Sequence, residues 1–308
     1  MELIYILTYD CNFRCNYCDI KKRKEDISED ILKKSLEFLE KNNFNIKKIK
    51  FFGWEPLLKK KEIEYIIENF PKKFNPKYFI TTNSSLIDKD FIKFCKKNNI
   101  NLTFSIDGNN KANSENRILK NWKNLSRNII ENTKKYSKII RINQVITSKN
   151  SKDFFKNFKF IYNLWVRKYN FLPEYYREWS KDWLKNLKYW FDKIFNFYKN
   201  WNNFELINIE NYSETSFFNL WLVIDTTWNI YWTNLILSWV FEKYKKELII
   251  WDIEKWLIYN FKNKKFIKNY VNKIENILRK EYSNNILKSV MYVDLILNNF
   301  CDKWNIKD

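Results

Sequence analysis

The stretch Asp10-Cys11-Asn12-Phe13-Arg14-Cys15-Asn16-Tyr17-Cys18-Asp19 carries three cysteines in a C-x3-C-x2-C spacing. The apolar run before it, residues 3–8, predicts a buried strand, so the cysteines follow a strand end. Three thiolates at this spacing can bind three irons of a cubane cluster. Most iron–sulfur clusters are held by four cysteines, so a set of three predicts a cluster with one iron open to a reactant.

A zinc site, or three incidental thiols, is the alternative explanation of these cysteines. Zinc in proteins takes four ligands, usually as two separated pairs or with His. The chain contains no His, and no further cysteine stands near the first three. The composition and the spacing therefore favour an iron–sulfur cluster.

The first half of the chain alternates short apolar runs with amphipathic segments, which predicts β/α units and a parallel sheet. Ser28 is a good helix N-cap, with Glu29 and Asp30 in the turn that follows it. Further helices are expected at 61–69, 88–98, 116–136 and 151–164. Strands are expected at 3–8, 48–52, 78–82, 101–105, 139–146 and 169–172.

Polar motifs stand at the carboxyl ends of these strands, where α/β folds bind ligands. Gly53-Trp54-Glu55-Pro56 follows the second strand, Thr82-Asn83 ends the third, and Ser105-Ile-Asp107-Gly108 ends the fourth. Taken in order after the cysteines, these strings resemble the signature of the radical S-adenosylmethionine (radical SAM) superfamily. The resemblance implies an α/β fold, a partial (β/α)6 TIM-like barrel with a small C-terminal α+β extension. The implied division is a core barrel at 1–177 and an extension at 178–308.

The resemblance also implies two cofactors and a reaction. In that superfamily the open iron of a [4Fe-4S] cluster binds S-adenosyl-L-methionine, and one electron cleaves it to a 5′-deoxyadenosyl radical. That radical would abstract hydrogen from a substrate. The implied metal ligands are Cys11, Cys15 and Cys18, and the implied cofactor-binding residues are Tyr17, Gly53, Trp54, Glu55, Thr82, Asn83, Ser105, Asp107 and Arg117.

Each implied contact has a chemical role. Tyr17 would pack beside the adenine, and the backbone of 53–55 would approach the amino group of the methionine moiety. The strand-end hydroxyl, amide and carboxyl groups suit the ribose and the ligand carboxylate, which Arg117 could hold bidentately. The family usually has T-N-G after the third strand, whereas this chain has Ser84. Radical chemistry demands no acid–base pair, so no catalytic side chain is assigned.

The pattern changes at about residue 178, to a long aromatic-rich helix (179–200), hairpin-like strands (219–233) and two terminal helices. The string Asp225-Thr-Thr-Trp228-Asn-Ile-Tyr231 resembles the SPASM/twitch extensions of peptide-modifying radical SAM enzymes. Those extensions usually carry cysteines for auxiliary clusters, but Thr233 stands here where a ligand is expected. Cys95 and Cys301 are interpreted as packed thiols. The implied substrate is a peptide or protein side chain.

Tryptophan stands at several positions whose neighbouring residues are typical of turns, where glycine would be expected. The chain has 2 Gly and 14 Trp, although average usage would give about 22 Gly. Trp54, Trp228, Trp251 and Trp256 stand in strings that read naturally with glycine. Our hypothesis is that these are UGA codons that the source organism reads as glycine; a chain that is simply rich in Trp is the alternative.

The formal net charge of +20 would suit nucleic-acid binding, but the lysines are spread over the whole chain. A nucleic-acid or nucleotide-modifying radical SAM enzyme and a non-catalytic iron–sulfur binding protein stand as alternatives. No apolar run approaches a membrane span, and the cysteines do not form a secreted disulfide framework, so a cytoplasmic protein is expected. Its expected partners are the substrate and an electron donor such as flavodoxin or ferredoxin.

Overall fold

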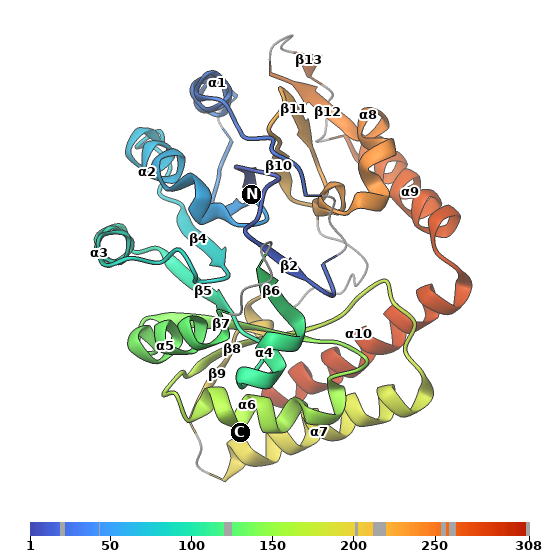
Figure 1. The fold of residues 1–308 in the computed structure, drawn as a ribbon. Coiled ribbons are helices and arrows are strands. Elements are labelled where there is room, and N and C mark those ends of the chain that lie inside the picture. Colours follow the sequence, from blue (N-terminus) through green and yellow to red (C-terminus); the bar gives the residue numbers. More distant parts are fainter. Residues whose placement is uncertain are drawn as a thin grey trace.

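A mixed sheet, parallel over most of its width, forms the centre of the molecule. The computed structural model describes residues 1–18, 22–42, 44–119, 125–200, 203–211, 220–253, 257–258 and 263–305. Within these residues the strands follow the order β13-β12-β11-β10-β1-β3-β4-β5-β7-β8-β9 (Figure 1). The parallel strands of the first part are β1 (Glu2–Ile6), β3 (Lys48–Phe52), β4 (Lys77–Thr82), β5 (Asn101–Ser105), β7 (Ile140–Ile146), β8 (Lys168–Pro173) and β9 (Glu205–Leu206).

Helices connect these strands and cover the outer face of the curved sheet (Figure 1). They are α1 (Glu29–Lys41), α2 (Lys60–Asn69), α3 (Lys89–Lys97), α5 (Ser126–Tyr136) and α6 (Phe154–Tyr162). In β7, residues alternate between full and partial burial, because every second side chain points under the helices and the others point to the concave face. The partial barrel and all six expected strands are confirmed, with shifts of one or two residues at most ends.

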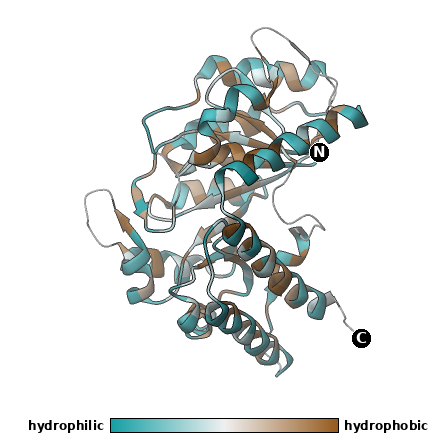
Figure 2. Cartoon of the chain, turned by 90° about the vertical axis from the view of Figure 1, so that its right-hand side faces the viewer, coloured by the Kyte–Doolittle hydropathy of each residue, from teal (hydrophilic) through white to brown (hydrophobic). Residues whose placement is uncertain are grey.

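Local chemistry explains where the helices begin. The Ser28 hydroxyl accepts a hydrogen bond from the Ile31 amide, as its capping role predicts, and two acidic residues occupy the first turn of α1. Asp88 caps α3 in the same way, since its carboxylate accepts from the Phe91 amide at 2.8 Å. The apolar faces of these helices pack on the sheet, where Figure 2 shows the hydrophobic residues gathered.

The expectation of one helix over 116–136 is wrong. The chain forms a short helix α4 (Asn110–Asn116), then the strand β6 (Arg117–Leu119), and only later α5. β6 pairs antiparallel with β2 (Phe13–Cys15), so that Arg117 lies opposite Cys15. The backbone groups of β6 therefore bond to the cysteine stretch, a long-range partner that helical periodicity cannot reveal.

The second half of the chain continues the same sheet. The strand β10 (Leu222–Ile224) pairs parallel with β1, and the expected hairpin forms between β10 and β11 (Asn229–Tyr231). The sheet ends in β12 (Ile249–Asp252) and β13 (Leu257–Ile258). The helices of this part are α7 (Lys181–Lys199), α8 (Lys245–Leu248), α9 (Lys264–Glu281) and α10 (Asn284–Asn305), and α10 lies against α7 (Figure 1).

The core is a continuous set of buried aliphatic and aromatic side chains from both halves. Cys95 and Cys301 are free thiols buried within it, as packed cysteines should be. Among the helices that the structure describes, none combines the length and the apolar character that crossing a bilayer requires.

Candidate functional site

The cysteine loop, residues 9–18, leaves the carboxyl end of β1 and is held by backbone bonds on both sides. The Tyr9 amide donates to the Glu25 carbonyl, and the Asn16 amide donates to the Asn116 carbonyl at 2.9 Å. The Cys11 amide donates to the Asp10 carboxylate at 2.7 Å, and the Cys11 Sγ accepts from the Phe13 amide. These contacts place the three thiols at the edge of the sheet where strand-end ligands bind.

The three thiols are suitable ligands for an iron–sulfur cluster, but their side chains are not arranged around a common metal position. Cys11 is buried, and Cys15 and Cys18 are half-buried. In the described part of the chain no group of three or more Cys, Asp or Glu side chains is arranged to hold a metal ion. Burial raises the pKa of Cys11 to about 12 and also raises that of Cys15, so both are neutral thiols until a metal displaces the proton.

The donor set fits a four-iron cluster with three protein ligands. Three thiols stand on one loop, and the other two cysteines are buried in the core, Cys95 on α3 and Cys301 on α10. Soft thiolates select iron–sulfur clusters or zinc. The loop must draw its three side chains together when such a group binds.

Tyr17 is joined to the end of β5 by a buried charge pair. Its hydroxyl donates to the Asp107 carboxylate at 3.1 Å, and Arg117 Nη2 donates to the same carboxylate at 3.0 Å. The Arg117 guanidinium also lies 5.4 Å from the centre of the Tyr17 ring. The Arg117 Nε is buried and has no hydrogen-bond partner among the described residues. The structure thus brings three of the predicted residues together beside the cysteine loop.

Asn12, between the first two cysteines, is clamped by the end of β4. The Asn83 side-chain amide donates to Asn12 Oδ1 at 2.8 Å, and Asn12 Nδ2 donates to the Ser85 hydroxyl at 2.9 Å. The Ser85 hydroxyl in turn donates to Asn83 Oδ1. This reciprocal set fixes the loop against the sheet. Asn12 and Ser85 carried no signal in the sequence, because their partners lie about 70 residues away.

Glu55 organises the next turn of the site. Its buried carboxylate accepts from the Thr82 hydroxyl at 2.6 Å, from the Asn83 amide at 2.8 Å and from the Leu57 amide at 3.0 Å. Burial raises the pKa of Glu55 to about 6, an effect that these hydrogen bonds oppose. The hydrogen bond between Thr82 and Glu55 therefore joins the end of β4 to the turn that follows β3.

Gly53 permits a close approach between β3 and the end of β1. It has φ of +149°, and a side chain there would put a Cβ 2.8 Å from the Thr8 carbonyl oxygen. The Trp54 indole follows directly and lies against Tyr9, with ring centres 4.9 Å apart. Its Nε1 is buried and finds no hydrogen-bond partner in the described residues. A large ring thus occupies the place where the sequence motif has a glycine.

Ser84 and Ser105 complete the predicted strand-end positions. Ser84 has φ of +63°, in the left-handed region that favours glycine. Its hydroxyl is buried and unpaired within the described chain, so the T-N-G pattern is also the one that the backbone prefers. Ser105 ends β5 and pairs in register with Asn143 of β7 on the concave face.

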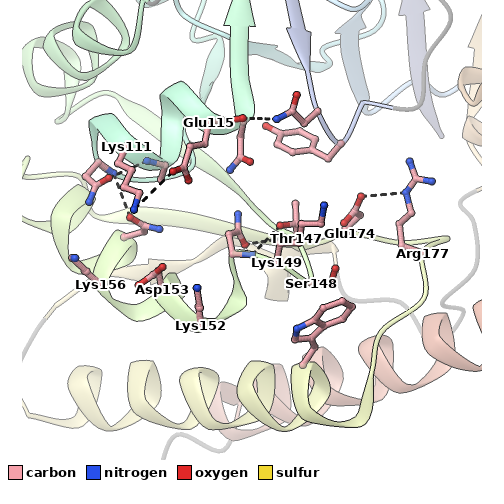
Figure 3. Close-up of a pocket in the computed structure, with 18 of the residues that line it drawn as sticks. Lys111, Glu115, Thr147, Ser148, Lys149, Lys152, Asp153, Lys156, Glu174 and Arg177 are labelled. Carbon is pink, nitrogen blue, oxygen red and sulfur yellow. Dashed lines mark hydrogen bonds and ion pairs between the residues drawn. The ribbon is translucent and has the colours of Figure 1, made fainter.

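A pocket of about 780 Å³ opens beside the cysteine loop (Figure 3). It lies between Tyr17, α4, the turn after β7, the end of β8 and the start of α7. Figure 3 shows lysines and acidic side chains facing each other across it, with Glu174 and Arg177 paired. The labelled lining residues are Lys111, Glu115, Thr147, Ser148, Lys149, Lys152, Asp153, Lys156, Glu174 and Arg177. Tyr17 is the predicted cofactor-binding residue that lines it; the others of that set are absent from its wall.

The cysteine loop lies in the part of the chain that a protein-family model matches. Residues 5–149, somewhat less than half of the chain, match the model of the Radical SAM superfamily. The cofactors of that family are a [4Fe–4S] cluster and S-adenosylmethionine.

Curated relatives share part of the chain. A cysteine-type anaerobic sulfatase-maturating enzyme of Clostridium novyi is 31% identical over 187 residues, which cover 56% of this chain and 50% of the relative. The radical SAM cyclopropyl synthase TigE of Paramaledivibacter caminithermalis is 25% identical over 209 residues, 58% of this chain and 43% of that enzyme. The chain thus spans about half the length of these relatives or less.

Solved structures share the fold over a longer range. The structure of anSMEcpe with bound AdoMet and the Cp18Cys peptide has a TM-score of 0.76 at 18% identity and covers 99% of both chains. Streptococcus suis SuiB bound to its precursor peptide SuiA has a TM-score of 0.55 at 15% identity, covering 74% of this chain and 58% of SuiB. At these identities the likeness concerns the fold.

Proposed function

We propose that this enzyme uses a [4Fe-4S] cluster to cleave S-adenosyl-L-methionine to a 5′-deoxyadenosyl radical, which abstracts hydrogen from a peptide or protein side chain. The cluster ligands in this proposal are Cys11, Cys15 and Cys18. The observation that carries it is the loop of three thiols at the carboxyl end of β1 within a radical SAM domain. When bound, the cluster supplies the electron for cleavage, and the chain's own residues bind, orient and shield the reactants.

The proposed contacts to S-adenosylmethionine follow the strand ends. Tyr17 packs beside the adenine, and the backbone of 53–55 receives the amino group. Thr82, Asn83 and Ser105 offer polar groups toward the ribose, and the Asp107–Arg117 pair offers its spare donor, Arg117 Nε, to the carboxylate. Support comes from the position of all these residues at one edge of the sheet, beside the cysteine loop.

We further propose that 178–308 is a SPASM-like extension without an auxiliary cluster, appended to a core at 1–177. The β10–β11 hairpin and the absence of further clustered cysteines in the sequence support this division. The peptide substrate would lie in the pocket beside Tyr17. The wall of this pocket carries amide, cationic and anionic side chains, which can hydrogen-bond to the backbone of an extended peptide. The proposed electron donor is flavodoxin or ferredoxin.

Anaerobic reconstitution with iron and sulfide tests the proposal. The reduced enzyme is expected to convert S-adenosylmethionine to 5′-deoxyadenosine and methionine, measured by liquid chromatography and mass spectrometry. The triple variant Cys11→Ala, Cys15→Ala, Cys18→Ala should form neither product. The matched control, Cys95→Ala with Cys301→Ala, removes two buried thiols and should keep the cluster. A bound zinc ion, or a cluster ligated by protein at all four irons, would overturn the proposal.

The substrate class needs a separate experiment. Short peptides encoded beside the gene, deuterated at the side chains, are incubated with the reduced enzyme. Deuterium that appears in 5′-deoxyadenosine identifies the donor side chain. Cleavage without deuterium transfer from any such peptide would count against a peptide substrate while leaving the cleavage reaction intact.

A non-catalytic iron–sulfur protein is the second candidate, and Trp54 is the observation that favours it. The half-buried indole stands beside Gly53 and packs against Tyr9, so it reduces the space for the ligand. The variant Trp54→Gly distinguishes the two candidates. Cleavage by the variant and none by the parent chain would show that the indole blocks the site.

A further inference from the structure

A second polar cavity, of about 90 Å³, lies on the concave face of the sheet toward the amino ends of the strands. Strand pairing places its side chains on one face: Lys50 lies beside Phe79, Thr81 beside Thr103, and Asn143 beside Asn170. Ser105 belongs to the same face and pairs with Asn143. The cavity therefore lies on the same face of the sheet as Ser105, one of the proposed cofactor contacts.

The charges around this cavity do not cancel. Lys48 pairs with Glu2 at 2.7 Å, and Arg141 pairs with Glu210 at 2.9 Å. Lys50 lines the cavity with them, but no carboxylate of the described residues comes within ion-pair distance of its amine. Its near neighbours are the rings of Phe52 and Trp221, 5.7 and 5.6 Å from Nζ. Among the described residues, the cavity wall thus carries one cation more than it has anions.

Neutral donors surround the same space without partners. The hydroxyls of Thr81 and Thr103 make no hydrogen bond with any described residue, although Thr103 is buried. Asn143 accepts from Asn170 through Oδ1, which leaves its own amide hydrogens available. Lys50 is half-buried, and an acceptor in the cavity would stabilise its amine and the unpaired donors. Burial lowers the pKa of Lys50, and an anion in the cavity would reverse that effect.

We propose that this cavity is a binding site for a carboxylate, with Lys50 as its counter-charge and Thr81, Thr103 and Asn143 as hydrogen-bond donors. A space of 90 Å³ accepts one carboxylate with its first carbons rather than a large ligand. Two sources supply this chemistry, a free small acid and an acidic group of the substrate. The second source rests on the proposed function.

Direct binding tests the site without cleavage chemistry. Acetate and its neutral isostere acetamide are titrated against the full-length reconstituted protein and followed by saturation-transfer NMR. Acetate should bind at least tenfold more tightly than acetamide. Lys50→Met should weaken acetate at least tenfold, whereas Lys48→Met, which removes a lysine already paired, should change binding less than twofold. Lys50→Arg should retain binding.

Several results would overturn the site: no saturable acetate binding, equal affinity for acetamide, or equal losses in the Lys48 and Lys50 variants. If Lys50→Met does not fold, the proposal is tested with Lys50→Gln, which should also weaken acetate binding, and with the comparison of acetate and acetamide on the parent protein. N-acetylglutamate methylamide separates the sources, because binding as tight as acetate indicates a peptide-borne acid and binding of acetate alone indicates a free acid. Cleavage of S-adenosylmethionine by the parent enzyme is scored separately, so failure of the proposed function is distinguishable.

Discussion

Trp165 adopts a backbone conformation that suits glycine. It follows the end of α6 with φ of +68°, donates its amide to the Tyr162 carbonyl at 3.0 Å, and leaves its side chain 68% exposed. A left-handed residue just after a helix is usually Gly. Trp54 does not share this conformation, since its φ is not positive, and Trp251 is fully buried between Phe38 and Phe44. Trp228 has an ordinary φ, and Trp256 lies outside the described residues.

Trp165→Gly should therefore raise the free energy of unfolding by about 1 kcal/mol, since it removes a side chain from the left-handed region. Urea unfolding measures the change. Trp183→Gly, in the first turns of α7, is the matched control and should lower it by a similar amount. For the codon hypothesis, UGG at codons 54, 228, 251 and 256 would be decisive against recoding, and codon 165 is a further position to read.

Ser84→Gly should be stabilising for the same backbone reason. The substitution relieves φ of +63° and removes a buried, unpaired hydroxyl, so a gain of about 1 kcal/mol is expected. Thermal or urea unfolding reports it. Ser85→Gly is the neighbouring control: it loses the bonds to Asn83 and Asn12 and should be destabilising. Stabilisation by both variants would contradict this account.

At the scale of elements, the cysteine loop is fastened to the last third of the chain. The Tyr9 hydroxyl donates to the Asp225 carboxylate at 2.6 Å, and Lys245 donates to the other oxygen of that carboxylate at 3.0 Å. Arg23 covers the Tyr9 ring at 3.7 Å. Elements far apart in sequence, β1, β10 and α8, thus meet two residues before Cys11. The geometry of the loop depends on the C-terminal part of the chain.

Asp225→Asn should cost on the order of 3 kcal/mol of stability, because Lys245 and Tyr9 would lose a buried acceptor for their protons. Denaturant unfolding is the measurement. Asp192→Asn, which breaks partly exposed ion pairs with Lys188 and Lys303, should cost less than about 1 kcal/mol. The double variant Asp225→Asn with Lys245→Met should recover part of the loss; equal effects of the two Asp variants would refute the buried anchor.

At the scale of the whole molecule, Glu55 predicts a pH dependence of stability. The pKa of its carboxyl is about 6 in the folded chain against 4.5 in a model peptide. Between these values the folded state binds more protons than the unfolded state, so the free energy of unfolding falls as pH rises through this window. The 1.5-unit difference corresponds to about 2 kcal/mol.

Comparison of the parent protein with Glu55→Gln isolates this contribution from those of other carboxylates. Urea unfolding is measured at several pH values from 4.5 to 7, and the parent-minus-variant difference should fall with rising pH. A difference that stays flat, or rises, would mean that Glu55 titrates at its ordinary value in the folded protein.

Features that depend on residues close together in the sequence were predictable, and features that depend on residues far apart in the sequence were not. The strands and most helices followed from local periodicity, and the cysteine loop from its spacing. β6 did not, because Arg117 owes its strand conformation to Cys15, about a hundred residues earlier. The Asn12–Ser85 clamp and the pocket beside Tyr17 likewise arise only when separate strand ends meet at one edge of the sheet.

The position of β1 between β3 and β10 has a consequence for synthesis of the protein. One edge of β1 gains its neighbour early, but the other stays unpaired until residues 222–224 emerge from the ribosome. Asp225, which holds Tyr9, emerges at the same moment. Until then the Tyr9 side chain, two residues before Cys11, lacks the carboxylate that holds it in the folded protein.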